Sequence, residues 1–420
     1  MDGAEQYRAL SSETLPPRLV SIPAVAARVG EDASAWKVRE VGDGNLNLVF
    51  IVEGPAGDVI VKQALPYVRL VGESWPLPLN RSFFEFHALT RQAWRDPGSV
   101  PEVFHFDEAQ ALIVMERLSP HVILRRKLIA GERVEDLGAR LGQFCARTAF
   151  RGSDLALPAA TRKADAALFL GNVDLMKITE DLVFTDPYFD AEMNSHTPGL
   201  EPIVAELRAD DALKAEAQHL LRRYATAAET MMHGDLHTGS VMCTDRETRV
   251  IDPEFASYGP MGFDLGMLVA NYLMAFLSQP AHRSKEECWP FQLWLLNVIG
   301  ETFTAFEAEF RRLWAEERAG MLYPRALFED QGRPSAPALE GVLAEIRRDA
   351  LGFCGIEMHR RSLSLAHNAD FEEIGDLRLR AKLEARSLVL GRELVMRRSQ
   401  YATTEHLMSA ARRRNAMDLS

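Results

Sequence analysis

Two polar loops constrain the fold of this chain most strongly, because each is dense in titratable side chains and bounded by apolar residues. The first, residues 232–241, carries Asp235 between two histidines. The second, residues 250–255, contains the acids Asp252 and Glu254. Asp235 and Asp252 are 17 residues apart, which leaves room for a loop and a tight hairpin. Phosphoryl transfer requires such a set, because one carboxylate orients or accepts the proton of a hydroxyl while others hold Mg²⁺.

The composition is that of an ordinary globular protein, with 47% hydrophobic and 26% charged residues. The net charge of −12 argues against a nucleic-acid-binding protein, which usually carries a basic excess. The longest apolar run, residues 265–277, is 13 residues long, whereas a membrane span needs ~20. The four cysteines lack metal-ligand spacing, and the N-terminus lacks the apolar core of a signal peptide. We therefore expect a cytoplasmic protein with free thiols.

The first 115 residues predict a small antiparallel sheet with one helix, because short alternating apolar runs are separated by Gly-rich turns. A further short helix is expected at residues 24–29, and the Gly- and Pro-rich segment 63–76 is too irregular to predict a regular element. The predicted strands are residues 36–41, 48–52, 59–63, 103–106 and 112–115, and the helix is residues 80–94.

The turn between the first two strands is a candidate phosphate-binding loop. Glycines there would let backbone N–H groups approach phosphate oxygens, but Asp-Gly between strands is equally a common hairpin signal. The candidate residues of this turn are Gly42, Gly44, Asn45 and Asn47.

Lys62 closes the third predicted strand, where a lysine can neutralise nucleotide phosphates. The alternative is a lysine at a strand end that points to water. Glu85 in the following helix either pairs with Lys62 or closes a capping box with Ser82, and the sequence favours neither.

From residue 134 onward, apolar residues recur at helical spacing. Asp264 is a good N-cap for the apolar helix that follows it. A later helix carries Arg360 and Arg361, which usually form a solvated basic face or pair with Glu357 at i+3 or i+4. Adjacent helical residues point about 100° apart, so both arginines cannot face a ligand equally. The last helices are predicted at residues 265–277, 291–314, 339–353 and 373–396.

The pair of polar loops resembles the catalytic and metal loops of the protein-kinase-like small-molecule kinases, which include the aminoglycoside and choline phosphotransferases. Five ordered markers narrow this resemblance to the methylthioribose kinases and extend it from the Gly-rich turn to Asp370. The markers are GDGNLN, VKQALPYVR with VGESWP, HGDLHTGS, DPEFA and the twin-arginine helix.

The resemblance implies an α+β, bilobal protein-kinase-like fold. Residues 1–115 would form an N-lobe with a five-stranded antiparallel sheet and one helix, and this lobe would bind the nucleotide phosphates. Residues 116–420 would form a larger, mainly helical C-lobe with the catalytic and substrate-binding residues, joined through a hinge near residues 114–119. The implied reaction is ATP-dependent phosphorylation of the anomeric hydroxyl of 5-methylthioribose, giving the 1-phosphate in methionine salvage, by a homodimer.

The resemblance also implies roles for single residues. Asp235 would be the catalytic base, and Arg360 and Arg361 would contact the sugar and the transferred phosphate. An acid at the position of Asp264 braces the catalytic loop in kinases, and His233 and His237 would be structural hydrogen-bonders. Lys62, Glu85 and the Gly-rich turn would hold ATP phosphates, and Mg²⁺ would be bound by Asp252 and Glu254. Adenine would bind the main chain of Glu116, Arg117 and Leu118.

One departure from general kinases permits the alternative of a pseudokinase. Kinases usually place an Asn five residues after the catalytic Asp as a second metal ligand, and this chain has Ser240. Glu254 can compensate, because residues two apart on an extended chain face the same side, so both its carboxylate and that of Asp252 can reach Mg²⁺. The alternatives are a related kinase of another sugar, an aminoglycoside or a choline-like acceptor, and a non-catalytic nucleotide-binding pseudokinase.

Overall fold

The computed structural model describes residues 7–41, 46–68 and 72–417. The chain forms two compact units: unit 1 comprises residues 1–121 and 249–256, and unit 2 comprises residues 122–248 and 257–420. The predicted boundary at residues 115 and 116 therefore lies six residues before the observed division. The sequence did not indicate that residues 249–256, with Asp252 and Glu254, group with the N-terminal unit.

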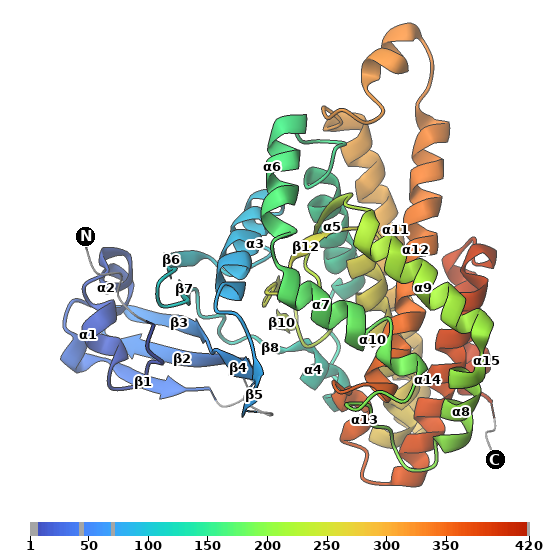
Figure 1. Cartoon of the computed structure of the whole chain (residues 1–420), viewed down its shortest axis with the longest axis horizontal. Helices are drawn as coiled ribbons and strands as arrows, with labels where there is room; N and C mark the ends of the chain where they lie inside the picture. Colours follow the sequence, from blue (N-terminus) through green and yellow to red (C-terminus); the bar gives the residue numbers. More distant parts are fainter. Residues whose placement is uncertain (1–6, 42–45, 69–71, 418–420) are drawn as a thin grey trace. The chain divides into compact units, whose positions relative to one another are not determined.

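Unit 1 contains the predicted five-stranded antiparallel sheet (Figure 1). Its strand order is β1-β2-β3-β7-β6, and the helix α3 (Arg81–Arg95) precedes β6 in the chain. The strands are β1 (Lys37–Glu40), β2 (Asn47–Gly54), β3 (Gly57–Ala64), β6 (Val103–Asp107) and β7 (Leu112–Met115).

Two small helices cover the apolar face of this sheet. Helix α1 (Leu15–Leu19) and helix α2 (Pro23–Val29) place leucines and valines in one core with Phe50 and Val61. The close approach of α2 depends on Gly54, where a Cβ would lie 2.3 Å from the carbonyl oxygen of Val29. The sequence predicted α2 but not α1, which begins with prolines that are compatible only with a first helical turn.

The segment that was expected to be irregular contains a two-stranded pair, and that expectation was wrong. Strand β4 (Tyr67–Val68) pairs with β5 (Gly72–Pro76), and the register shifts between Tyr67 and Val68. Such an irregularity disrupts the two-residue alternation by which a strand is recognised in a sequence.

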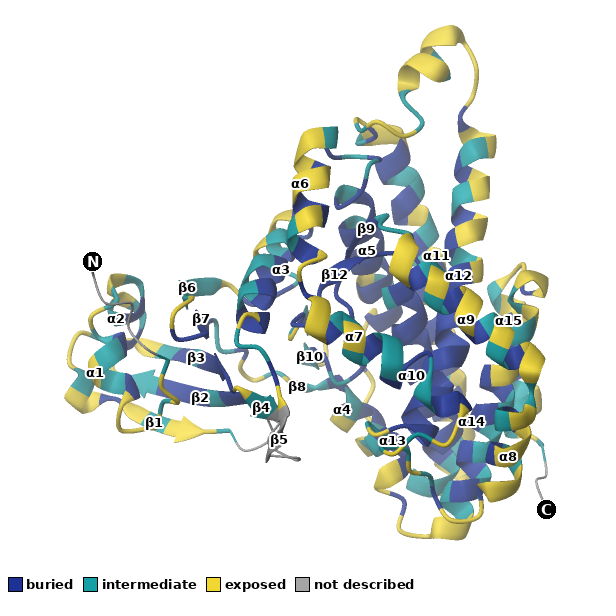
Figure 2. Cartoon of the chain, in the orientation of Figure 1, coloured by how far each residue is buried: buried dark blue, intermediate teal, exposed yellow. Residues whose placement is uncertain are grey.

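Unit 2 is mainly helical, as predicted. Helix α5 (Leu137–Arg151) packs against α11 (Lys285–Glu316), and α12 (Ala336–Leu363) packs against α10 (Phe263–His282) and α14 (Leu377–Arg397). Figure 2 shows that α10 is buried along most of its length. The other helices are α4 (Leu124–Ala130), α6 (Ala159–Phe169), α7 (Val173–Leu182), α8 (Glu201–Ala209), α9 (Asp211–Thr226), α13 (Ala369–Glu372) and α15 (Thr404–Asn415).

Short strands frame the polar loop of unit 2. Strand β9 (Thr230–Met232) pairs antiparallel with β12 (Ser257–Gly259), and β10 (Val241–Cys243) pairs antiparallel with β8 (Val122–Ile123). Strand β11 (Thr248–Val250) leads from unit 2 into the segment of unit 1. Among the helices in the described ranges, none combines the length and the apolar character needed to cross a membrane.

Helices α12 and α14 approach each other closely at a pair of glycines. A Cβ on Gly355 would lie 2.4 Å from the carbonyl oxygen of Gly391, and a Cβ on Gly391 would lie 2.9 Å from the ring of His359. The fully buried His359 lies 2.9 Å through Nδ1 from the hydroxyl of Tyr188 and 3.0 Å through Nε2 from the carbonyl oxygen of Leu388. Because a carbonyl only accepts, Nε2 carries a hydrogen.

We predict that His359 makes unit 2 sensitive to acid. Burial lowers the pKa of His359 from 6.5 to about 4. The unfolded chain therefore binds a proton at this histidine near pH 6.5, whereas the folded chain does not bind it until the pH approaches 4. The free energy of unfolding consequently decreases as the pH falls from 6.5 toward 4. Between pH 7 and pH 5 this amounts to about 2 kcal/mol.

Urea unfolding of the wild type and of His359→Gln at both pH values measures this effect. The variant should be less stable at pH 7 but should lose about 2 kcal/mol less on acidification. His219→Gln, on the exposed face of α9, controls for the substitution itself. An equal loss in wild type and His359→Gln would contradict the assignment.

Candidate active site

In unit 1, Lys62 on β3 binds two carboxylates. Its Nζ lies 2.8 Å from Oε1 of Glu85 on α3 and also donates to Oδ1 of Asp252. Burial disfavours the charged form of Lys62, but Asp252 and Glu85 outweigh burial and raise its pKa. Helix α3 begins after Asn80 without a side-chain cap. The structure thus shows Glu85 paired with Lys62, and the alternative of a capping box is wrong.

Asp252 and Glu254 belong to the same cluster, although the chain between them is not extended as expected. Asp252 has a φ of +67°, in the left-handed region that Asp tolerates better than most residues. The buried carboxylate of Glu254 accepts from Nε of Arg81 at 3.2 Å and from Nδ2 of Asn47 at 3.3 Å. A left-handed turn, rather than strand alternation, therefore accompanies the approach of the two acids.

These carboxylates fit a divalent cation. One oxygen each from Glu85, Asp252 and Glu254 lie within 4.8 Å of one another. Burial raises the pKa of Glu85 to about 7 and also raises that of Glu254, and in both cases the charge of Asp252 adds to the effect. Three acids face two cations, Lys62 and Arg81, so a further cation would offset the excess negative charge. Carboxylate oxygens are the ligands that hard divalent cations prefer.

The predicted hinge residues follow β7 in unit 1. The amide of Glu116 donates to the carbonyl oxygen of Glu102 at 2.8 Å, and Arg117 is tied by Nη1 to Asp58 on β3 at 2.7 Å. The carbonyl oxygen of Glu116 and the N–H of Leu118 are hydrogen-bonded to no other residue within the described ranges. One acceptor and one donor are thus available, which is what an adenine ring needs.

Of the four residues predicted to form the phosphate-binding loop, the structure describes only Asn47. Gly42, Gly44 and Asn45 lie outside the described residues. Asn47 opens β2, and its side chain is buried against Glu254.

In unit 2, the loop after β9 is held from behind by Asp264. Its two carboxylate oxygens accept from the amides of His233, at 2.6 Å, and Gly234, at 3.0 Å. Gly234 has a φ of +88°, which only glycine adopts readily. The predicted brace is confirmed, but the predicted N-cap role is wrong, because the N-cap of α10 is Gly262 and Asp264 lies inside the first turn.

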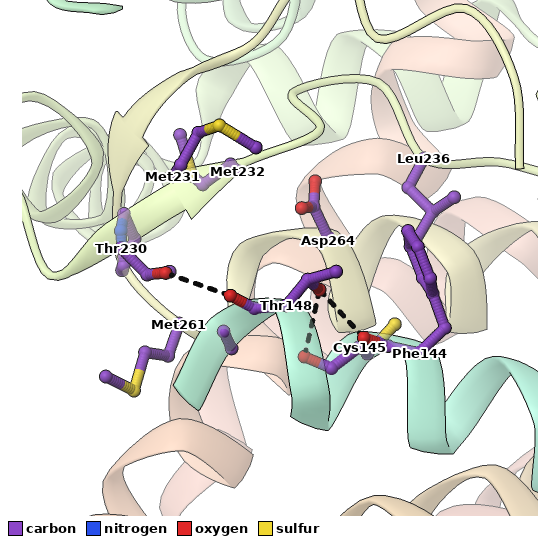
Figure 3. A pocket seen from close by; sticks show the side chains of 11 residues that line it. Phe144, Cys145, Thr148, Thr230, Met231, Met232, Leu236, Met261 and Asp264 are labelled. Atoms are coloured by element: carbon purple, nitrogen blue, oxygen red, sulfur yellow. Dashed lines mark hydrogen bonds between the residues drawn. The ribbon is translucent and has the colours of Figure 1, made fainter. Parts of the chain in front are cut away.

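A small cavity lies behind this loop (Figure 3). Its walls are mostly apolar and include Leu236, Met232 and Cys145, with Asp264 at one side. Of the polar loop 232–241, only the apolar residues Met232 and Leu236 line this cavity. The polar side chains of the loop do not line it.

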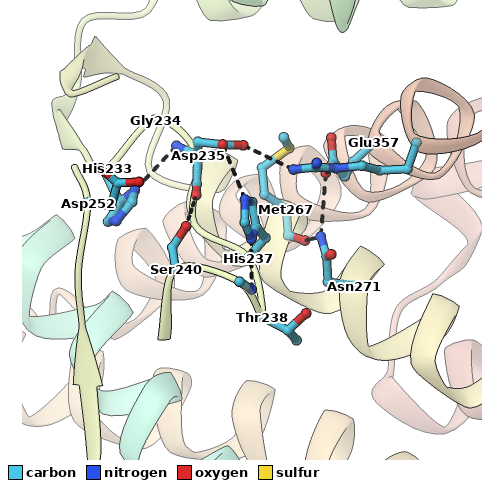
Figure 4. A network of polar contacts seen from close by, with 12 residues as sticks. His233, Gly234, Asp235, His237, Thr238, Ser240, Asp252, Met267, Asn271 and Glu357 are labelled. Atoms are coloured by element: carbon cyan, nitrogen blue, oxygen red, sulfur yellow. Dashed lines mark hydrogen bonds and ion pairs between the residues drawn. The ribbon is translucent and has the colours of Figure 1, made fainter. Parts of the chain in front are cut away.

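Asp235 is held by His237 (Figure 4) and by both arginines. Nδ1 of His237 accepts from the amide of Gly239 at 2.8 Å, so the neutral ring carries its hydrogen on Nε2, 3.3 Å from Oδ2 of Asp235. Burial lowers the pKa of His237 to about 4. Burial would raise the pKa of Asp235, but His237, Arg360 and Arg361 together hold it well below its usual range. Asp235 is therefore an ionised, oriented acceptor.

Two further polar groups of this loop have local roles. Ser240 Oγ donates to the carbonyl oxygen of Asp235 at 3.0 Å, and Nδ1 of His233 accepts from the amide of Asp235 at 3.3 Å. The expectation that His233 and His237 are hydrogen-bonders agrees with these contacts. Ser240 closes the loop that carries Asp235.

The twin arginines meet at one oxygen. Nη1 of Arg360 lies 3.5 Å and Nη2 of Arg361 lies 3.3 Å from Oδ1 of Asp235. Both long side chains reach this carboxylate although they leave the helix about 100° apart.

Sequence reasoning missed Arg125 on α4. Its Nε lies 3.1 Å from Oγ1 of Thr238, and its Nη2 lies 2.8 Å from Oδ1 of Asn271. The same Nε lies 3.4 Å from the fully buried Asp370, whose pKa burial raises to about 6. The only signal in the sequence was Asn271, a polar residue inside an otherwise apolar run.

An oriented carboxylate in a loop braced by Asp264 and a lysine–carboxylate cluster are the parts of a phosphotransferase of the protein-kinase-like class. The model of the phosphotransferase enzyme family (APH) matches residues 37–286. Methylthioribose kinase of Escherichia coli O45:K1 (strain S88 / ExPEC) is 40% identical over 97% of this chain and 98% of its own length.

Two more relatives agree with this comparison. Methylthioribose kinase of Geobacillus kaustophilus (strain HTA426) is 44% identical over 91% of this chain and 93% of its own length. Methylthioribose kinase 1 of Oryza sativa subsp. japonica is 38% identical over 94% of this chain and 93% of its own length. The chain therefore belongs to the methylthioribose kinases, within the phosphotransferase enzyme family. Membership implies ATP and a divalent metal ion.

We predict that Asp252 and Glu254 bind this ion. Asp252→Asn and Glu254→Gln should each weaken the binding of Mn²⁺, added with ADP, roughly tenfold or more, because each removes a charged oxygen ligand. Electron paramagnetic resonance of free Mn²⁺ measures the affinity. Glu102→Gln, an exposed acid of unit 1 that pairs with Arg28, should bind as the wild type does. Unchanged affinity in both site variants would exclude these ligands.

Proposed function

We propose that this chain transfers the γ-phosphoryl group of ATP to the anomeric hydroxyl of 5-methylthioribose, giving 5-methylthioribose 1-phosphate and ADP in methionine salvage. The observation that supports it best is the convergence of Arg360 and Arg361 on Asp235, in a chain 38–44% identical to methylthioribose kinases. That arrangement places two cationic donors beside the carboxylate that would face the acceptor.

Asp235 would orient the acceptor hydroxyl and accept its proton. An ionised carboxylate fixed by His237 is prepared for this role, because it needs no proton loss or rotation before the hydroxyl binds. Arg360 and Arg361 would hold the sugar and the charge that develops on the transferred group.

The charge balance of unit 2 favours a neutral acceptor over a cationic one. The described polar network contains three arginines and three carboxylates. Those residues are Arg125, Arg360, Arg361, Asp235, Glu357 and Asp370. A cationic acceptor such as an aminoglycoside or choline would bind better where carboxylates are in excess. The equal numbers of acidic and basic side chains therefore support a neutral sugar as the acceptor.

In unit 1, Lys62 and the turn around Gly42, Gly44, Asn45 and Asn47 would bind the ATP phosphates. Glu85 orients Lys62, and the main chain at Glu116, Arg117 and Leu118 would bind adenine. Asp252 and Glu254 would hold Mg²⁺, which when bound offsets the negative charge of phosphate oxygens.

Two competing functions make different predictions. A related kinase would use the same acids with another sugar, an aminoglycoside or a choline-like acceptor. A pseudokinase would bind nucleotide without turnover, and only Ser240 favours it. Because the Ser240 hydroxyl is used within its own loop and Glu254 supplies a second acid beside Asp252, the active kinase is the better supported function.

The proposal also includes a cytoplasmic location and a homodimer, both of which the family resemblance implies. Sedimentation velocity of the purified chain would decide the oligomeric state.

We predict turnover with 5-methylthioribose that depends on Asp235. In a coupled assay of ADP release with ATP and Mg²⁺, Asp235→Asn should lower kcat about 10²–10⁴-fold, because it removes the proton acceptor. Asp245→Asn, an exposed acid after β10 that pairs with Lys127, is the matched control and should retain activity.

Ribose, choline and kanamycin are the comparison acceptors. Turnover only with one of them would replace the proposed substrate. ATP binding without turnover of any acceptor would favour the pseudokinase.

We further predict that His237 acts as a neutral donor. Because its pKa is lowered to about 4, kcat/KM should show no step from this residue between pH 5.5 and pH 8. His237→Leu should lower kcat roughly 10–100-fold, the value of a hydrogen bond to a charged group, whereas His237→Gln keeps an N–H and should lose less. A loss of activity below pH 6.5 that is abolished in His237→Gln would indicate a charged His237 instead.

A further inference from the structure

Glu357 is a fully buried carboxylate that the proposed reaction does not use. It lies on α12, three and four residues before the twin arginines. Its Oε1 accepts from Nε of Arg361 at 2.5 Å and from Nδ2 of Asn271 at 3.4 Å, and its Oε2 accepts from Nη1 of Arg360 at 3.3 Å. Buried polar groups are hydrogen-bonded, and a buried carboxylate that accepts from three side chains has a structural role.

The spacing explains how two diverging residues serve one site. Arg360 and Arg361 leave the helix about 100° apart, yet both guanidinium groups reach Oδ1 of Asp235. Positions i+3 and i+4 are the two neighbours of a helical residue on its own face. Glu357 therefore lies between the two side chains and draws both toward the same side of α12.

The two arginines are not held equally. Arg361 is anchored at both ends of its guanidinium, by Glu357 at Nε and by Asp235 at Nη2. Arg360 makes contacts of 3.3 Å or longer with the same two acids, and its buried Nε has no hydrogen-bond partner among the described residues. Arg360 can therefore turn toward an incoming anionic group at lower cost than Arg361.

Asn271 extends this arrangement to the loop that carries Asp235. Its Nδ2 donates to Glu357 (Figure 4), and its Oδ1 accepts from Arg125, which also contacts Thr238. The loop and α12 are thus joined through α4 and α10 by a continuous chain of buried and partly buried hydrogen bonds.

We infer that Glu357 is a positioning residue for phosphoryl transfer: its carboxylate fixes Arg361 against Asp235 and leaves Arg360 free to meet the transferred group. This inference rests on the proposed function. Without the carboxylate, the two guanidinium groups repel each other and share Asp235 alone, so neither is held where the acceptor binds.

The test compares Glu357→Gln with Glu384→Gln. Glu384 is also buried on a helix, α14, and pairs in the same i, i+4 spacing with Arg380 at 3.2 Å. Glu357→Gln should lower kcat with 5-methylthioribose about 10²-fold, as expected for misplaced catalytic groups, while KM for ATP stays at the wild-type value. Glu384→Gln should retain the wild-type kcat.

A double-mutant cycle separates positioning from a general structural role. If Glu357 acts through Arg361, Glu357→Gln should have little further effect in an Arg361→Met background, whereas Glu384→Gln should be additive with Arg361→Met. Full additivity of Glu357→Gln with Arg361→Met overturns the inference.

Should Glu357→Gln fail to fold, Glu357→Asp keeps the charge but retracts it by one methylene, and it should show the same loss in kcat. Wild-type activity in either folded variant overturns the inference alone. Absence of turnover in the wild-type chain overturns the proposed function, and the inference with it.

Discussion

The ionised carboxylate of Asp235 is the group on which unit 2 depends, because a buried charge is tolerated only where other groups compensate it. His237 donates from one side, and two arginines approach from α12. Those arginines need compensation in turn, which Glu357 provides, and Asn271 and Arg125 continue the sequence of partners to Asp370. Helices α4, α10, α12 and α13 are thereby tied to one loop by polar contacts as well as by apolar packing.

The cluster of charged side chains in unit 1 has a different charge balance. There, Lys62 and Arg81 face three carboxylates, and burial, together with the charge of Asp252, raises the pKa values of Glu85 and Glu254. The network of unit 2 is balanced, which suits a neutral sugar, and the cluster of unit 1 is unbalanced, which suits a metal ion. In both units the network consists of acidic and basic side chains. The two networks differ in the ratio of anionic to cationic side chains.

Much of this arrangement could be predicted from local sequence. The strands, the long helices and the brace at Asp264 follow from alternation, periodicity and resemblance, whereas the choice between the Lys62 pair and a capping box for Glu85 needed the structure. Other features could not, because they depend on residues far apart in the chain. Nothing near Arg125 indicates Asp370 as a partner, and nothing around Asp252 indicates a left-handed φ. Helix α1 was missed for a local reason, since prolines usually end helices and here begin one.

The grouping of residues 249–256 with the N-terminal unit has a consequence for synthesis on the ribosome. When residue 121 has emerged, the sheet and α3 are complete, but the segment that brings Glu254 to the fully buried Arg81 is still more than a hundred residues from being made. A nascent N-terminal unit therefore holds this buried guanidinium without its carboxylate partner until residues 122–248 of the helical unit have been translated. Separate expression of residues 1–121 would leave that guanidinium without the carboxylate of Glu254. Unit 1 is therefore incomplete without residues 249–256.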